Sequence, residues 1–289
     1  MPARLIAHIP DGPAVSFWLE DDRQYVLGRG EDCGLQVRHG SVSRKHLRLE
    51  LSLDSGRLHD LGSKNGTRVD GQRVELAELR GMHWLEVGEV SCQLEVCSAE
   101  QLEQGRRRQQ SRIEQSRTLG DQVAAAPPAD VLQQSLEAVA QLAECDRAAI
   151  LLPDGDQFRV AAALGARAAS NAQGEFIGSR SALQRALTSG LPVVVNDIRV
   201  DATLSRQQSV VSAGLHCLLV LPLQHEDEVV GLIYADRRND AQPITEFDLS
   251  LVNAFAERAA VWLAARRSIE SLDALPALAG DREEGARSA

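Results

Sequence analysis

The chain has 289 residues, a formal net charge of −10 and a hydrophobic share of 44%, which is typical of soluble globular proteins. At about 100–200 residues per domain, this length predicts two domains. The acidic balance excludes a general affinity for nucleic acid, whose binding proteins carry basic surfaces, but it leaves room for one local basic pocket.

The five cysteines are odd in number, widely spaced and without a CxxC pair. This usage predicts free thiols in a reducing compartment. The N-terminal apolar stretch is too short for a secretory signal, and no run approaches the ~18 apolar residues of a membrane span. We therefore expect a cytoplasmic location.

Residues 1–97 contain several short segments in which apolar and polar residues alternate. Residues 46–51 alternate strictly, and similar segments cover 4–9, 15–19, 24–27, 56–61 and 90–96. Turn signals such as Asn65-Gly66 and Asp70-Gly71 lie between them. Regularly spaced short strands of this kind predict an all-β sandwich.

Residues 98–128 are rich in Glu, Gln and Arg and hold almost no apolar side chains. We interpret them as a charged segment that forms either a solvated helix or a flexible linker. Pro127 and Pro128 end whatever helix precedes them, because proline lacks the N–H that continues a helix.

Residues 129–270 alternate between helical and strand patterns. Helices are expected at 131–143, 181–189 and 245–265, the last with Thr245 as N-cap and Asp248 three residues later. Strands are expected at 148–152, 217–223 and 229–236, with the last two adjacent. The pattern predicts an α+β domain with an antiparallel sheet. Residues 271–289 are rich in Ala, Gly and charge and are expected to be disordered.

Three polar loops of the first domain carry groups suited to phosphate. Their sequences are LGRG at 27–30, SVSRKH at 41–46 and DLGSKNGT at 60–67. Arg29 offers a bidentate guanidinium, Ser43 a hydroxyl, Lys64 an ammonium in a turn, and Asn65 an amide able to hold a peptide main chain. Loops at one end of a sandwich converge, so these groups are expected to share a site.

The order GR, SRKH, DLGSKNGT and VDG resembles the signature of forkhead-associated (FHA) domains over residues 1–97. The resemblance implies an eleven-stranded β-sandwich that binds phosphothreonine peptides at its loop end. Carried over by position, phosphopeptide contacts are implied for Arg29, Ser43, Lys64 and Asn65, with Arg44 either contacting ligand or shaping a loop. Loop-shaping roles are implied for Gly28, His46 and Gly66.

The second half resembles GAF domains, which are small-molecule-binding and dimerising modules of signalling proteins. The matching segments are LVLPL at 219–223, VGLIYADR at 230–237 and ITEFDL at 244–249, with Asp197 and Asp201 also fitting. The ligand stays unknown, because the NKFDE motif of cyclic-nucleotide binding is absent. An empty pocket used only for packing and dimerisation remains an alternative.

Cofactor chemistry in this half finds little support. The order His216-Cys217 reverses that of bilin attachment sites, so Cys217, like Cys145, is expected to be a structural residue. His216 and His225 lack a third ligand at useful spacing, which argues against a metal site. No P-loop, GxSxG or HExxH occurs, and two cysteines are too few for a reductase of free methionine sulfoxide, so no enzyme activity is expected.

The sequence therefore predicts a non-enzymatic signalling adaptor. Its expected partner is a phosphothreonine-containing protein, either a Ser/Thr kinase or a kinase substrate, without nucleic acid or membrane. The GAF domain would sense a ligand, form a homodimer, or do both. The alternatives are a sensor whose main input is the GAF ligand, and an accessory protein of transcription regulation.

Two further expectations concern assembly and self-recognition. The helix at 245–265 is predicted to expose an apolar stripe of Leu251, Phe255, Ala259 and Trp262, and the helix at 131–143 carries another. We do not expect one monomer to cover both, which predicts a homodimer through the GAF half. Thr118 follows basic residues and precedes an aspartate three positions later, so we hypothesise that phosphorylated Thr118 can occupy the FHA site of its own chain or of a dimer partner.

Overall fold

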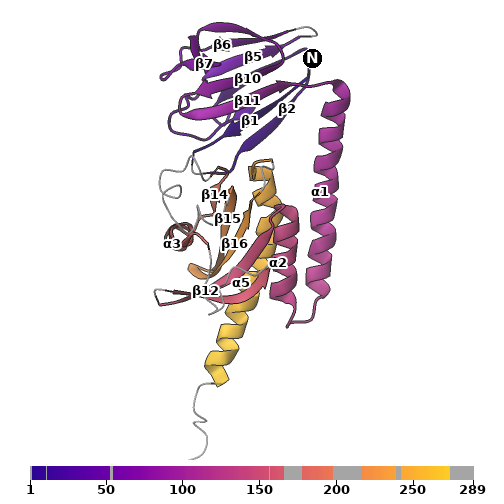
Figure 1. The fold of residues 1–289 in the computed structure, drawn as a ribbon, viewed down its shortest axis with the longest axis vertical. Helices are drawn as coiled ribbons and strands as arrows, with labels where there is room; N and C mark the ends of the chain where they lie inside the picture. The colour runs from indigo at the N-terminus through magenta and orange to yellow at the C-terminus, as the bar shows by residue number, and fades with distance from the viewer. Residues whose placement is uncertain are drawn as a thin grey trace, which may run out of the picture.

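The computed structural model describes residues 2–10, 12–52, 55–155, 157–165, 178–197, 216–238 and 242–273. A β-sandwich and an α+β domain follow one another along the long axis of the molecule, and helix α1 (Ala99–Ala125) descends from the sandwich beside the second domain (Figure 1). Within the ranges given above, no helix combines the length and the apolar character that crossing a bilayer would need.

The first domain is the expected all-β sandwich. One sheet has the strand order β2-β1-β11-β10-β7-β8, and the other has the order β4-β3-β5-β6-β9. Eleven strands are found in the part of this domain that the structure describes. They are β1 (Ala3–His8), β2 (Val15–Leu19), β3 (Arg23–Gly28), β4 (Leu35–Gln36), β5 (Leu47–Leu51), β6 (Gly56–Asp60), β7 (Thr67–Val69), β8 (Gln72–Val74), β9 (Leu76–Leu79), β10 (Met82–Val87) and β11 (Val90–Val96).

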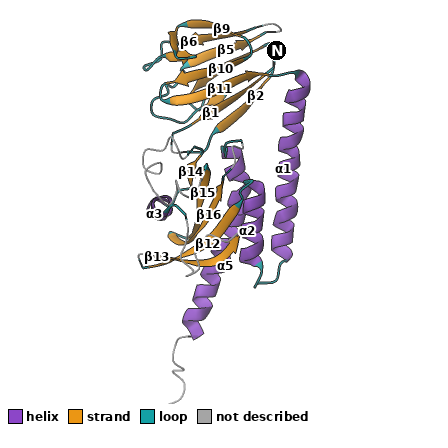
Figure 2. Cartoon of the chain, viewed as in Figure 1, coloured by secondary structure: helices purple, strands orange, loops and turns teal. Residues whose placement is uncertain are grey.

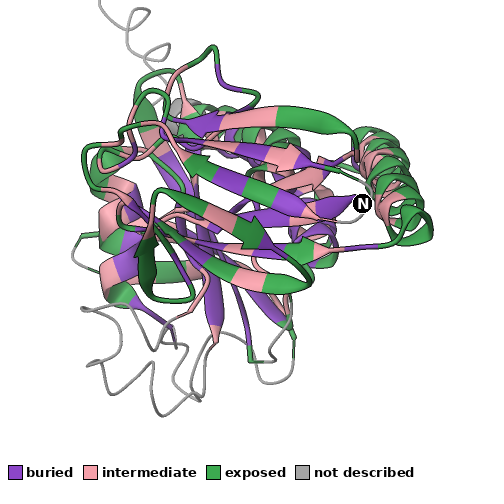
Figure 3. Cartoon of the chain, turned by 90° about the horizontal axis from the view of Figure 1, so that it is seen from above, coloured by how far each residue is buried: buried purple, intermediate pink, exposed green. Residues whose placement is uncertain are grey.

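The interior of the sandwich follows from period-two alternation. In β5, Leu47, Leu49 and Leu51 are buried between the sheets, while Arg48 and Glu50 face outward. Buried and exposed segments alternate in the same way along several strands in Figure 3. Each fully buried leucine contributes about 1.5–3 kcal/mol, so this core fixes the strand ends from which the loops emerge.

Helix α1 resolves the question left open for residues 98–128. Ser98 caps it through a capping box, in which its hydroxyl accepts from the Gln101 N–H and its own N–H donates to the Gln101 side chain. The few apolar residues of the segment pack α1 against the second domain. Ile113 and Leu119 are half-buried and Val123 is buried, all against the core of the second domain.

The second domain has the expected α+β architecture. Its sheet has the order β13-β12-β16-β15-β14 with every neighbouring pair antiparallel. Helices α2 and α5 pack on one face and α3 on the other, as Figure 2 outlines. The bounds are α2 (Val131–Leu142), β12 (Arg147–Asp154), β13 (Gln157–Leu164), α3 (Arg180–Ser189), β14 (Val193–Val195), β15 (Cys217–His225), β16 (Glu228–Arg237) and α5 (Glu246–Asp273).

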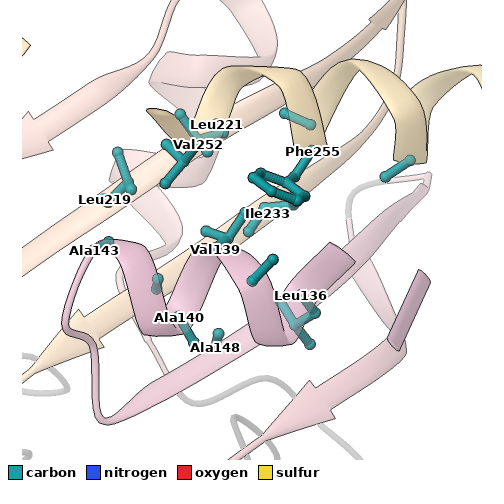
Figure 4. Close-up of a cluster of buried hydrophobic side chains, with 14 of the residues drawn as sticks. Leu136, Val139, Ala140, Ala143, Ala148, Leu219, Leu221, Ile233, Val252 and Phe255 are labelled. Carbon is teal, nitrogen blue, oxygen red and sulfur yellow. The ribbon is translucent and has the colours of Figure 1, made fainter. Parts of the chain in front are cut away.

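The apolar stripe of α5 is buried in the structure, whereas the sequence predicted that it is exposed. Leu251, Phe255 and Ala259 are only 8%, 3% and 0% exposed. Figure 4 shows Phe255 lying between the labelled residues of α2 and the sheet. The prediction of an exposed stripe is therefore wrong, because α2 and the sheet of the same chain cover these residues; Trp262 at its end is half-buried.

The start of α5 matches the sequence prediction. The Thr245 hydroxyl accepts from the Asp248 N–H at 3.3 Å, and the Asp248 carboxylate accepts from the Thr245 N–H at 2.6 Å. The helix extends to Asp273, beyond the expected end at residue 265. The tail 271–289 was expected to be disordered, which is wrong for residues 271–273 because they belong to α5; residues 274–289 and Asp201 lie outside the described residues.

Candidate functional site

Three loops meet at one end of the sandwich and are tied together by backbone hydrogen bonds. They join β3 to β4, β4 to β5, and β6 to β7. The Arg29 N–H donates to the Ser43 carbonyl at 3.0 Å, and the Leu61 N–H donates to the His46 carbonyl at 2.9 Å. The three sequence motifs, which are separated along the chain, are thus held in fixed register with one another.

A cavity of about 710 Å³ lies at this end and carries an excess of positive charge. Among the residues that the structure describes, Arg29, Arg44 and Lys64 form no ion pair with any carboxylate. Lys45 is instead bound to Asp32 at 3.0 Å. The lining consists of Arg29, Asp32, Gly40, Ser41, Val42, Ser43, Arg44, Lys45 and Lys64. Three unpaired cations around one cavity suit a dianionic ligand.

Ser43 lies at the centre of this arrangement. Its hydroxyl oxygen accepts a hydrogen bond from the Lys64 N–H at 3.0 Å. The hydroxyl proton is left over, because a serine side chain can accept and donate at once. Ser43 therefore links two of the three loops and still has a donor to offer to an oxygen of a bound anion.

Asn65 lies next to the cavity rather than in its lining. Its side-chain Nδ2 donates to the Ser41 carbonyl at 2.8 Å, and the residue is exposed. Sequence reasoning brought Asn65 into the site by position alone. In the structure the same side chain also ties the loop after β6 to the loop before β5, and its carbonyl oxygen stays available to a ligand.

His46 is fully buried beneath the loops. Its Nδ1 accepts from the Ser43 N–H at 3.1 Å, and its Nε2 lies 3.2 Å from the Gly66 carbonyl oxygen. These contacts require the neutral tautomer with the proton on Nε2. Burial lowers the pKa of His46, and the neighbouring Gly66 carbonyl and Asp60 only partly oppose this. The neutral ring holds the Ser43 amide in place.

Asp60 is a residue of the site that sequence reasoning did not single out. Its carboxylate accepts from the Ser63 N–H at 2.8 Å, from the Ser63 hydroxyl at 2.7 Å and from the Thr67 hydroxyl at 2.6 Å. Burial raises the pKa of Asp60, but these hydrogen bonds outweigh it, so the net pKa is lowered. The signal available in the sequence was that Asp60 opens the polar loop DLGSKNGT, since aspartate side chains often hydrogen-bond the backbone of the turn that they begin.

Two glycines of the site, Gly28 and Gly66, leave no space for a side chain. A Cβ on Gly28 would lie 2.1 Å from the Arg44 carbonyl oxygen. Gly66 has a φ of +78°, a conformation that other residues rarely adopt, and a Cβ there would meet the Arg73 guanidinium at 2.9 Å. Close backbone approach at Gly28 and the turn at Gly66 together shape the loops around the cavity.

Thr118 lies far from these loops along the fold. The β10–β11 turn touches the cavity, because the Glu89 N–H donates to the Ser41 hydroxyl at 2.8 Å. From there β11 runs to the opposite end of the sandwich, where α1 begins. Thr118 is exposed on α1, and its hydroxyl donates to the Glu114 carbonyl at 3.1 Å. The segment around it is a helix, so the flexible linker assumed for self-recognition is not what the structure contains.

Of the two cysteines of the second domain, Cys217 is buried and Cys145 is half-buried against the core. Burial raises the pKa of the Cys217 thiol to about 11, and burial likewise raises the pKa of Cys145. Thiols of this kind are poor nucleophiles at neutral pH. No cluster of three or more metal-ligating side chains occurs within the described ranges.

Comparison with known proteins identifies both domains. Residues 25–88 match the FHA domain model, and residues 127–263 match the GAF domain model. A search of curated proteins gives no match to the chain.

Several solved structures are similar to one or the other half. The FHA domain of the CT664 protein from Chlamydia trachomatis is 23% identical, with coverage of 34% of this chain and 100% of that chain and a TM-score of 0.32. An FHA domain studied for phosphothreonine-dependent interactions is 24% identical, with coverage of 34% and 99% and a TM-score of 0.31. The GAF domain of a phosphoenolpyruvate-protein phosphotransferase from Coxiella burnetii is 13% identical, with coverage of 56% and 98% and a TM-score of 0.46.

Both matches agree with the fold, a β-sandwich followed by an antiparallel sheet with helices, and the chain contains an FHA domain followed by a GAF domain.

Proposed function

We propose that the FHA domain binds a phosphothreonine-containing segment of another protein in the cavity at its loop end. The observation that carries this proposal is the group of three unpaired cations, Arg29, Arg44 and Lys64, around one cavity. A phosphate dianion would be held by charge-assisted hydrogen bonds from these side chains and from the Ser43 hydroxyl. Arg29 and Lys64 are exposed, so they can reach a ligand without first breaking an ion pair.

The position of Asn65 favours a peptide over free phosphate. Its amide lies beside the cavity, where the chain on either side of a phosphothreonine would pass, and it can accept from a peptide N–H. The FHA family resemblance supplies the preference for threonine, whose γ-methyl group would be buried. One buried methyl is worth about 0.8 kcal/mol, or roughly a four-fold difference in affinity.

Titration calorimetry with three peptides of one sequence tests the proposal. The peptides carry phosphothreonine, phosphoserine or unmodified threonine at the same position. We expect binding in that order, with no measurable affinity for the unmodified peptide. Equal binding of all three would reject phosphate recognition, and equal binding of the two phosphopeptides would reject only the preference for threonine.

At the level of the whole protein, we propose a non-enzymatic adaptor. The FHA domain would dock on a threonine phosphorylated by a Ser/Thr kinase, with the kinase or its substrate as partner, while the GAF domain senses a ligand or supports assembly. In the alternative, the GAF ligand is the main input, or the protein assists transcription regulation through a partner. A small molecule that co-purifies with the GAF domain, combined with weak phosphopeptide binding, would favour the alternative.

Recognition of the chain's own Thr118 is a second proposal for the same cavity. A phosphothreonine in an extended peptide would require the middle of α1 to unwind, or a second molecule to present it. Phosphorylation at an exposed helix surface is a charge change that can melt a turn locally. Kinase treatment followed by mass spectrometry tests modification. If it occurs, Thr118→Ala should raise the apparent affinity for an external phosphopeptide.

We still propose a homodimer through the GAF domain, but through other residues than those expected from the sequence. The residues expected to support it are buried in the monomer, but Val261 and Ile269 further along α5 are 56% and 59% exposed. With the exposed Ala265 they recur every four residues, which places them on one face of the helix. This part of α5 projects beyond the body of the GAF domain in Figure 1.

A further inference from the structure

A second cavity, of about 420 Å³, lies between the two domains and is unrelated to the phosphopeptide loops. Its walls are the outer face of β1 and β2 in the FHA domain, one side of α1, the end of α2 and the start of α5. This volume is within the range of small-molecule sites, which span about 300–1,000 Å³. The cavity exists only because the domains are docked, so its occupant would contact both.

Specific contacts hold these walls together. Ala14 of the FHA domain forms two backbone hydrogen bonds with residues at the start of α5: its N–H donates to the Ile244 carbonyl, and its carbonyl accepts from the Glu246 N–H, both at 2.9 Å. Arg106 on α1 pairs with Glu20 of the FHA domain at 2.5 Å. The cavity is therefore built by defined contacts between the domains.

Arg237, in the GAF wall, is a buried cation that pairs with no carboxylate of the described residues. The residue is 3% exposed, and two of its nitrogens donate to the carbonyl oxygens of Ala143 and Gln242, which also line the cavity. Its Nε has no acceptor, and it forms no ion pair with any residue in the described ranges. A buried guanidinium of this kind is costly unless an anion compensates its charge.

Arg4, in the FHA wall, is a second cation without an ion pair. Its Nε donates to the Ser16 hydroxyl at 3.3 Å, and its guanidinium lies over the Trp18 ring at 5.1 Å. No described carboxylate binds its terminal nitrogens. Burial lowers the pKa of Arg4, Glu95 acts in the opposite direction, and the nearby Arg108 lowers the pKa further.

Four of the other charged side chains of the lining form ion pairs with each other, while Glu95 is a carboxylate of the lining that pairs with none of the described residues. Arg112 is paired with Asp248, and Arg108 with Glu144 at 3.8 Å. The aromatic faces are also covered, since arginines lie over Trp18 and over Phe247. The cavity therefore offers two free guanidinium groups but no open platform on which a ring could stack, which favours a compact anion over a nucleobase.

We propose that this interdomain cavity binds a compact polyanion whose acidic oxygens bridge Arg4 of the FHA domain and Arg237 of the GAF domain. The class includes diphosphates and di- or tricarboxylates, which share two or more anionic groups on a short frame. Because the anion contacts both domains, its binding stabilises their docked arrangement.

The fluorescence of Trp18 tests the proposal directly. The chain has three tryptophans, so replacing Trp84 and Trp262 by phenylalanine leaves Trp18 as the only one. The substitution Arg29→Ala is added to weaken anion binding at the phosphopeptide site. Titration with pyrophosphate and, separately, with citrate distinguishes a phosphate ligand from a carboxylate one. A saturable change in Trp18 emission with either anion is expected.

Two matched variants in this background complete the experiment. Arg4→Gln should weaken binding at least about ten-fold, because it removes a charge-assisted contact. Arg57→Gln, at an exposed position of β6 that does not line the cavity, should leave binding unchanged. No saturable change with either anion up to about 10 mM, a concentration beyond the weakest specific affinities, would overturn the proposal. A change insensitive to Arg4→Gln would overturn it as well.

Discussion

Arg29 is the side chain on which phosphopeptide recognition should depend most. It is exposed, free of any described ion pair and part of the cavity lining. Arg29→Ala should weaken phosphopeptide binding by roughly ten- to a hundred-fold, the value of a charge-assisted contact. Arg38→Ala is the matched control, since Arg38 is an exposed arginine of the following loop that does not line the cavity. Calorimetry that finds equal losses in both variants would point to general charge rather than to a site.

His46 couples the geometry of the loops to pH. Because burial lowers the pKa of His46 below its ordinary 6.5, the unfolded chain takes up a proton before the folded one does. The free energy of unfolding of the FHA domain is therefore full above pH 6.5 and decreases as the pH falls below it, by at most about 1.4 kcal/mol per pH unit for this residue. Urea unfolding between pH 7 and pH 5 measures the slope.

His8 must be separated from this effect, because burial lowers the pKa of His8 as well. The variant His8→Gln should keep the part of the slope that belongs to His46. Asp60 does not interfere, since its lowered pKa places the loss of its contribution at pH values below the ordinary 3.8. A slope that vanishes completely in His8→Gln would show that His46 does not resist protonation.

At the scale of elements, α1 contains two glycines that should respond oppositely to the same change. A Cβ on Gly105 would lie 2.1 Å from the Trp18 ring, whereas one on Gly120 would meet nothing within 4 Å. Alanine in a helix interior is favoured over glycine by about 1 kcal/mol. Gly120→Ala should therefore raise stability by about that amount. Gly105→Ala should lower it, because overpacking costs about 1–3 kcal/mol.

Urea denaturation midpoints of Gly105→Ala and Gly120→Ala test whether the two substitutions change stability in opposite directions. Stabilisation by both substitutions would mean that α1 does not lie against Trp18 in solution, and the description of the docked domains would have to be abandoned. Trp18→Ala combined with Gly105→Ala supplies the control, because removal of the ring should restore the gain from alanine.

The elements that sequence alone predicted well are those with strong periodicity. The strictly alternating residues of β5 and the apolar strands β15 and β16 were expected where they occur, and the loop motifs carry the FHA signature. Short strands such as β4 and β7, with two and three residues, were not expected, because two or three positions are too few to show an alternation of apolar and polar residues. Their existence depends on hydrogen bonds to distant strands.

The prediction that the apolar stripe on α5 is exposed was wrong for a related reason. A helical pattern tells which face is apolar but not what covers it, and only the tertiary fold placed α2 and the sheet there. The role of Asp60 and the presence of Arg4 and Arg237 in one cavity could not be predicted from the sequence either. Both depend on contacts between segments far apart along the chain. The motif order predicted the cavity's cations, whereas the fold determined which of them are already paired.

At the scale of the whole molecule, the oligomeric state can be tested most directly. The stripe of Val261, Ala265 and Ile269 predicts a dimer at tens of micromolar in light scattering, a concentration at which weak specific interfaces form. A charge in its middle, Ala265→Glu, should give a monomer, whereas Asn253→Glu on an exposed position nearer the start of α5 should not. A monomeric wild type would remove the stripe from consideration as an interface.

The route of the chain through the FHA domain has a practical consequence. Ala3 pairs with Val96 close to the start of α1, whereas His8 pairs with Ser91 at the end that holds the cavity. At ~3.3 Å per residue, the six residues of β1 separate the two ends by ~20 Å. A fluorescent protein joined ahead of Ala3 would thus emerge beside the start of α1 and leave the loops unobstructed. The same spacing lets a bulky phosphorylated protein dock at the loops without colliding with a tag at the N-terminus.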